Sequence, residues 1–159
     1  LISQGRLEEA EKHFQRALEL RPGNPNANTS LGNIRYLQGR HREARAFFEE
    51  ALKNDPALLA ALLNCAWMLA TAPDDAARDG ARAVELAERA VQSAAREDPL
   101  VLNTLAAAYA EAGRFEDAIT AITRAIDLAE AAGNAELARS LRQSAVLFQN
   151  REPRGSKSP

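Results

Sequence analysis

The side chains best suited to catalysis are few and scattered. The sequence has two histidines, His13 and His41, and one cysteine, Cys65. No serine or cysteine motif surrounds the histidines, and the neighbouring acids follow ordinary helical i, i+4 charge patterning. Asp74 and Asp75 form a carboxylate pair, but acids beside a proline usually form turns. The sequence therefore predicts no catalytic residue, no metal site and no cofactor.

Phosphate binding and thiol chemistry find equally little support. Gly5 and Gly39 stand 34 residues apart, whereas a phosphate-binding loop needs clustered glycines. A single cysteine excludes an internal disulfide and a multi-cysteine metal site. Cys65 aligns with Leu31 and Leu105, which predicts a buried structural thiol. We therefore turn to the elements that position these residues.

Composition favours closely packed helices. The chain has 159 residues, 46% hydrophobic and 26% charged, with a net charge of −2. It is rich in alanine, the best helix former, and poor in glycine and aromatic residues. Charges interrupt every apolar run before the roughly 18 residues of a membrane helix, and no basic field suits nucleic acid. Together these features predict an all-α protein that neither spans a membrane nor binds nucleic acid. Arginine greatly outnumbers lysine, which is typical of GC-rich bacterial genes.

A segment that begins with Gly-Arg and ends with Ala recurs along the chain. It is followed at fixed distances by Phe, Ala and Pro, and its first two copies are 34 residues apart. The copies are anchored at Gly5, Ala10, Phe14, Ala17 and Pro22; at Gly39, Ala44, Phe48, Ala51 and Pro56; more weakly at Ala83, Ala87 and Ala90; and at Gly113, Ala118, Ile122 and Ala125. This period indicates stacked helix pairs.

A second signature places a small residue after a larger apolar one. It appears as Leu31-Gly32, Cys65-Ala66 and Leu105-Ala106, where we expect two helices to cross. Together with the distant Ala-x3-Phe-x2-Ala and closing proline, this pattern resembles the tetratricopeptide repeat over roughly residues 1–128. The resemblance implies a right-handed α-solenoid of antiparallel helix pairs with a C-terminal capping helix.

The pattern predicts where helices begin and end. We expect helices at residues 7–20, 25–38, 41–54, 58–71, 79–94, 99–112, 115–132 and 135–149. Prolines should separate units, and glycines should occupy positive φ in the turns inside them. These positions are Pro22, Pro56 and Pro99, and Gly5, Gly39 and Gly113.

The predicted organisation is an array at residues 1–132 followed by a cap and a tail. The array divides into a half repeat at 1–22 and repeats at 23–56, 57–98 and 99–132, with the capping helix at 133–150 and a disordered tail at 151–159. Leu1 to Gln4 resemble the last turn of a preceding helix, so we interpret the chain as a fragment of a longer protein. Residues 71–80 form a longer connection, which either contacts a partner or is a tolerated insertion.

In the family that the chain resembles, the first helices of successive units line a concave groove that holds an extended peptide. Carried over by alignment, the peptide-binding residues are Asn26, Thr29, Ser30, Asn33, Tyr36, Leu63, Asn64, Trp67, Asn103 and Thr104. Asparagine offers both a donor and an acceptor to a peptide backbone. The predicted surface holds one acid, Glu111, and no base, so binding should depend little on salt.

Other interpretations of these residues remain open. Trp67 either anchors a ligand or packs against the connection at Pro73, and the asparagines also fit a helix face without a ligand. The chain itself is predicted to be a non-enzymatic protein-binding scaffold. The alternatives are the C-terminal repeat tail of an enzyme or membrane protein, such as a glycosyltransferase, and a repeat protein that self-associates through an incomplete N-terminal edge.

Overall fold

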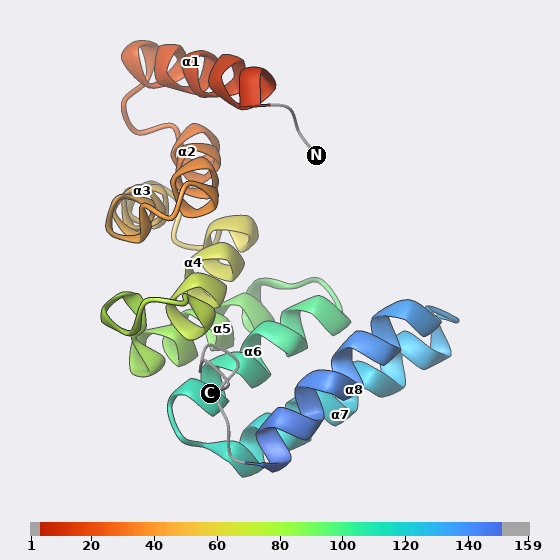
Figure 1. Cartoon of the computed structure of the whole chain (residues 1–159). Coiled ribbons are helices and arrows are strands. Elements are labelled where there is room, and N and C mark those ends of the chain that lie inside the picture. Colours follow the sequence, from red (N-terminus) through yellow and green to blue (C-terminus); the bar gives the residue numbers. More distant parts are fainter. Residues whose placement is uncertain (1–3, 151–159) are drawn as a thin grey trace. The chain divides into compact units, whose positions relative to one another are not determined.

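The computed structural model describes residues 4–150, which form eight α-helices, one short 3₁₀ helix and no strand (Figure 1). The elements are α1 (Gln4–Leu20), α2 (Pro25–Leu37), α3 (His41–Asn54), α4 (Leu59–Thr71), η1 (Asp75–Ala77), α5 (Gly80–Ser93), α6 (Pro99–Glu111), α7 (Phe115–Ala131) and α8 (Ala135–Gln149). The all-α prediction is confirmed over this range. The predicted tail at 151–159 lies outside the described residues.

The chain divides into two compact units, and the boundary falls after Cys65, inside α4. The first unit therefore contains α1, α2, α3 and the start of α4. The second contains the rest of α4 and α5 to α8. Each unit has its own packed helices, and we describe each by itself.

Glycines close the turns between the helices of a pair. Gly39 and Gly113 have φ angles of 73° and 76°. At the first of these turns the Arg40 N–H donates to the carbonyl of Arg35 at 2.8 Å, so the last turn of α2 is capped. The predicted positive φ at both glycines is confirmed. Gly133, with a φ of 69°, repeats the arrangement between α7 and α8.

The predicted turn at Gly5 is wrong, because α1 begins at Gln4 and includes this glycine. At Gly39, the glycine follows a helix whose carbonyls accept the hydrogen bonds of the turn. Gly5 instead lies in the first turn of α1. The glycine therefore joins the helix that follows it.

The three prolines lie in connections between helices or in the first turn of a helix. Pro99 occupies the first turn of α6, where its missing N–H costs no helical hydrogen bond. The Asp98 carboxylate caps the same helix by accepting from the Leu100 N–H at 2.8 Å. Pro22 and Pro56 lie in the connections before α2 and α4.

In the first unit, α2 and α3 cross at a small residue. A Cβ added to Gly32 would lie only 2.6 Å from Cε1 of Phe48, so the aromatic ring fills the space that glycine leaves. Phe48 is 1% exposed, and Ala44 and Ala51 are fully buried. The predicted crossing at Gly32 is confirmed.

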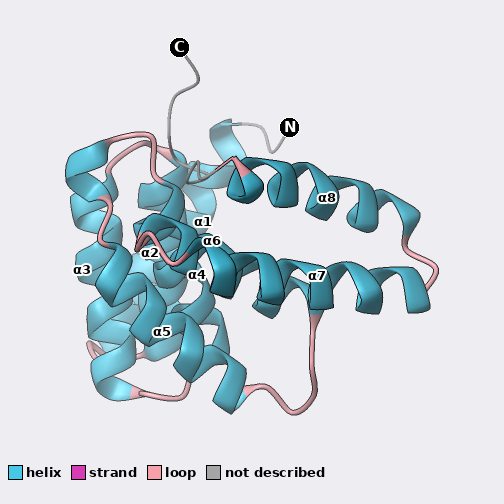
Figure 2. Ribbon diagram, turned by 90° about the horizontal axis from the view of Figure 1, so that it is seen from below, coloured by secondary structure: helices cyan, strands magenta, loops and turns pink. Residues whose placement is uncertain are grey.

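In the second unit, α6 packs against α5 and α7, and α7 packs against α8. Ala118, Ile122 and Ala125 of α7 are fully buried. Figure 2 shows α7 and α8 running side by side. Leu141 and Phe148 of α8 are buried. The role of α8 as a cap remains a prediction.

Candidate peptide-binding surface

The predicted residues on α2 follow one side of the helix. Asn26, Ser30 and Asn33 are separated by four and three residues, which places them on a common face. Asn26 is exposed, and the other two are half-buried. Within the part of the chain that the structure describes, none of these three side chains forms a hydrogen bond. Their donors and acceptors are therefore available to a ligand.

The two predicted threonines are buried instead. Thr29 is 6% exposed and Thr104 is 5% exposed. Each hydroxyl donates to the carbonyl four residues earlier, to Pro25 at 2.8 Å and to Leu100 at 3.0 Å. A ligand-binding role for both threonines stays a prediction, and their hydroxyl protons are already used within their own helices.

Tyr36 stands at the end of the same helix, next to the glycine turn. Its ring centroid lies 5.6 Å from that of His41, the first residue of α3, at a tilted angle of 50°. Tyr36 is half-buried. This ring contact ties the predicted surface to the turn that follows α2.

The remaining predicted residues divide between the units. Leu63 and Asn64 belong to the first unit and are half-buried, and the Asn64 side chain has no hydrogen-bond partner among residues 4–150. Trp67 and Asn103 belong to the second unit, are half-buried, and already interact with other residues of the chain. The unused polar groups are therefore concentrated in the first unit.

Sequence reasoning missed a base beside Glu111. The Nε of Arg78, in the α4–α5 connection, donates to Oε1 of Glu111 at 3.0 Å, and the two side chains are only 11% and 14% exposed. Burial opposes the charge of Arg78, but the hydrogen bonds and charges of Glu111 and Asp75 outweigh it and raise the pKa of Arg78 above its usual range. The prediction that no base accompanies this acid is wrong.

A second buried arginine joins the first three helices. Nη2 of Arg35, on α2, lies 2.7 Å from Oε1 of Glu11 on α1, and its Nε lies 3.3 Å from Glu43 on α3. The hydrogen bond from Arg35 lowers the pKa of Glu11 below its ordinary value. Arg35 occupies the position of Leu69 and Tyr109 in later repeats, so aligning the repeats gives no sign of an ion pair here.

Two further properties concern only residues 4–150. Among these residues, the structure shows no group of three or more histidine, cysteine, aspartate or glutamate side chains that could hold a metal ion. Over the same residues, every helix is too short or too polar to cross a bilayer.

Paired helices joined by glycine turns, with small residues where they cross, define a helical-repeat protein. Family models of the tetratricopeptide repeat match residues 1–58 and 99–132. The chain belongs to the tetratricopeptide repeat family, as its sequence pattern predicted. Repeats of this family generally mediate protein–protein interaction and are typically non-catalytic. A search of curated proteins found no relative that matches the chain.

Proposed function

We propose that the chain binds an extended protein segment along the polar face of its first helices. The row of Asn26, Ser30 and Asn33 carries this proposal, because three unused polar side chains share one face of α2. An amide group accepts from a backbone N–H and donates to a backbone carbonyl. A row of amide and hydroxyl side chains therefore binds a peptide main chain without selecting strongly among its side chains.

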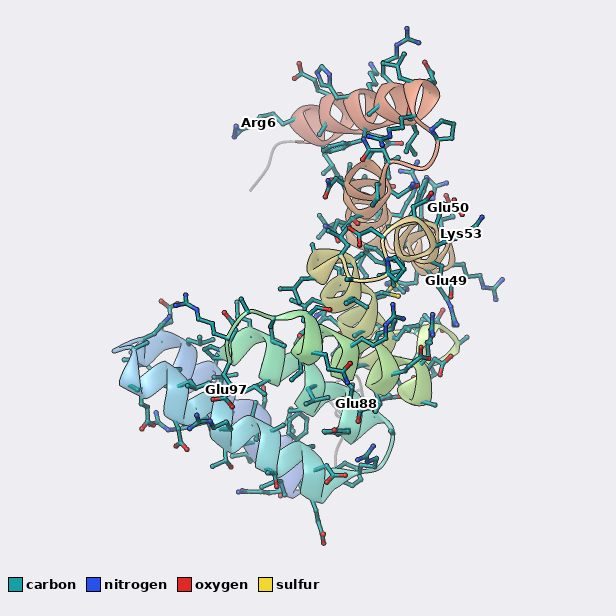
Figure 3. All side chains as sticks on the ribbon, turned by 180° about the vertical axis from the view of Figure 1, so that it is seen from behind. Arg6, Glu49, Glu50, Lys53, Glu88 and Glu97 are labelled. Carbon is teal, nitrogen blue, oxygen red and sulfur yellow. The ribbon has the colours of Figure 1, made fainter. Side chains whose placement is uncertain are left out.

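The charges on α3 favour the polar face of the first helices, rather than the outer faces of the repeats, as the binding surface. Arg45 pairs with Glu49 at 2.9 Å, and Lys53 pairs with Glu50 at 3.4 Å. Figure 3 shows Glu49, Glu50 and Lys53 on this helix. Because these charges compensate one another, α3 has fewer unpaired charges for a charged ligand than its composition suggests.

The test is a peptide selected from a phage-displayed random library on the intact chain. Its affinity is then measured by fluorescence anisotropy for Asn33→Ala and Asn64→Ala. Each variant should weaken binding by about 0.5–1.5 kcal/mol, the net worth of one hydrogen bond. Gln92→Ala, which changes an exposed polar residue on α5, is the matched control. Thermal melting of all three variants checks their folding.

Two results would contradict the proposal. One is equal affinity of the wild type and both asparagine variants. The other is a steep loss of affinity with added salt, which would place the contact on charged faces such as that of α3.

A second candidate function is self-association through α1. Phe14 is only half-buried, whereas Phe48, at the equivalent position of the next repeat, is 1% exposed. Leu20, at the end of α1, is 74% exposed. Burying these side chains against a second copy would remove apolar surface from water.

Light scattering across the micromolar range tests this candidate. We expect the average mass to rise with concentration, and Leu20→Asp to reduce the rise. Val146→Asp changes an equally apolar residue on α8 that is 53% exposed, and it should have no effect. An average mass equal to that of the monomer at every concentration would contradict self-association.

A further inference from the structure

We propose that the connection between α5 and α6 forms a second binding site, for a protein segment that presents an apolar side chain next to a carboxylate. A pocket of about 250 Å³ lies there. It is lined by Val91 at the end of α5, by the connection, and by Val101 and Leu102 in the first turn of α6. The pocket lies wholly within the second unit and shares no lining residue with the predicted peptide-binding surface.

The lining provides apolar contact area. Val101 and Leu102 are 4% and 9% exposed, so they form a buried part of the lining. Val91 is 38% exposed, and Leu100, which precedes Val101, is 56% exposed. Exposed apolar side chains beside a preformed hollow are typical of a place where a partner inserts a side chain.

The charged residues of the pocket differ in whether their side chains already have partners. Glu97, labelled in Figure 3, accepts from Nε of Arg124 on α7 at 3.1 Å. The carboxylate of Asp98 accepts from the N–H of Leu100 in the cap of α6. Arg96 is exposed and has no hydrogen bond or ion pair within the described residues. Its guanidinium is therefore free to bind a carboxylate, with two parallel hydrogen bonds.

The size of the pocket indicates what it takes. Sites for drug-sized molecules start at about 300 Å³, so this hollow is too small for most of them. It suits one branched or aromatic side chain. With Arg96 beside it, the matching segment has Leu or Phe directly next to Asp or Glu.

The probe is the capped tripeptide acetyl-Asp-Leu-Asp-amide, titrated into the ¹⁵N-labelled full chain and followed by NMR. We expect saturable shifts of the backbone amides of Val91, Arg96 and Val101. Acetyl-Asn-Leu-Asn-amide removes the charges, and acetyl-Asp-Ser-Asp-amide removes the apolar group. Each should bind severalfold more weakly than the first peptide.

Variants of the chain complete the test. Arg96→Gln should lower the affinity for the charged peptide to that for its neutral analogue, and Val91→Ser should also weaken it severalfold. Arg139→Gln is the control. It changes an exposed arginine on α8, away from the pocket lining, and should leave the affinity unchanged. Dispersed amide spectra of all variants verify folding.

Three results would overturn the proposal. They are equal binding by Arg96→Gln and the wild type, shifts confined to other residues, and no saturable shift. Shifts confined to α2 would instead support the peptide-binding surface, so the two sites are tested separately.

Discussion

The α2–α3 and α4–α5 connections reverse the chain in different ways. The first spans residues 38–40 and relies on the backbone of Gly39, whose φ is 73°. The second spans residues 72–79 and is held by side chains. There, the Arg78 guanidinium donates to the carbonyl of Ala72 at 2.9 Å and to Glu111 at 3.0 Å.

The difference lies in where the cause of each turn is found. Gly39 acts through its own φ, and a Cβ there would meet nothing within 4 Å. Arg78 acts through Glu111, 33 residues further along the chain. Gly80 adds to this dependence, because a Cβ added at this position would lie 2.8 Å from the backbone nitrogen of Ala112. The longer connection therefore depends on the end of α6, and the short one does not.

The largest effect is expected from Arg78→Ala. Removing the guanidinium leaves a nearly buried carboxylate on Glu111 without its partner, and this should destabilise the chain by about 3 kcal/mol. Urea unfolding followed by circular dichroism measures the loss. Arg82→Ala removes a more exposed arginine that pairs with Glu85 on its own helix, and should cost less than about 1 kcal/mol. Equal losses would show that Arg78 does not hold the connection.

A smaller effect is expected from Gly39→Ala. Alanine has room at this position, so the cost comes only from its positive φ, at about 1 kcal/mol. The same unfolding experiment measures it. Gly113→Ala has the same surroundings and should give a similar value. An unchanged stability in both variants would show that the two turns do not depend on glycine.

The smallest effect concerns the pH dependence of Glu11. Its folded-state pKa lies below the ordinary value of 4.5, mainly because of the hydrogen bond from Arg35. The ionised group therefore contributes stability above that ordinary value, and the contribution disappears as pH falls through the lower folded-state pKa. The loss is small because Arg35 keeps Glu43 as a second partner.

Comparing the wild type with Glu11→Gln tests this. The difference in their unfolding free energies should be constant around neutral pH and should shrink in acid. A difference that stays constant down to the most acidic folded conditions would contradict the expected role of Glu11.

Helix boundaries were largely predictable because local residues mark them. Pro99 with its Asp98 cap, and the glycine turns, place helix ends within one or two residues of expectation. Arg35 and Arg78 gave no such signal, since their partners lie 24 and 33 residues away. Gly5 shows the opposite failure, because the same local signal as at Gly39 lies inside the first turn of a helix, α1.

The helices that carry the predicted site residues were predictable, but the side of each helix on which a residue lies was not. Adjacent residues on an α-helix point about 100° apart, so neighbours such as Thr29 and Ser30 cannot face a ligand equally. The alignment assigned both to the surface, and the structure buries Thr29 while leaving Ser30 partly exposed. Side-chain pattern alone does not fix the helix rotation this closely, because small polar residues tolerate either environment.

Within each unit, the helices that pack together are neighbours in the sequence, such as α1 with α2 and α6 with α7. Such low contact order requires only short loops to close, so each unit is expected to fold quickly. It also allows a helix to detach without disturbing distant ones. Amide hydrogens of α6, which is packed between α5 and α7, should therefore exchange with solvent much more slowly than those of α1.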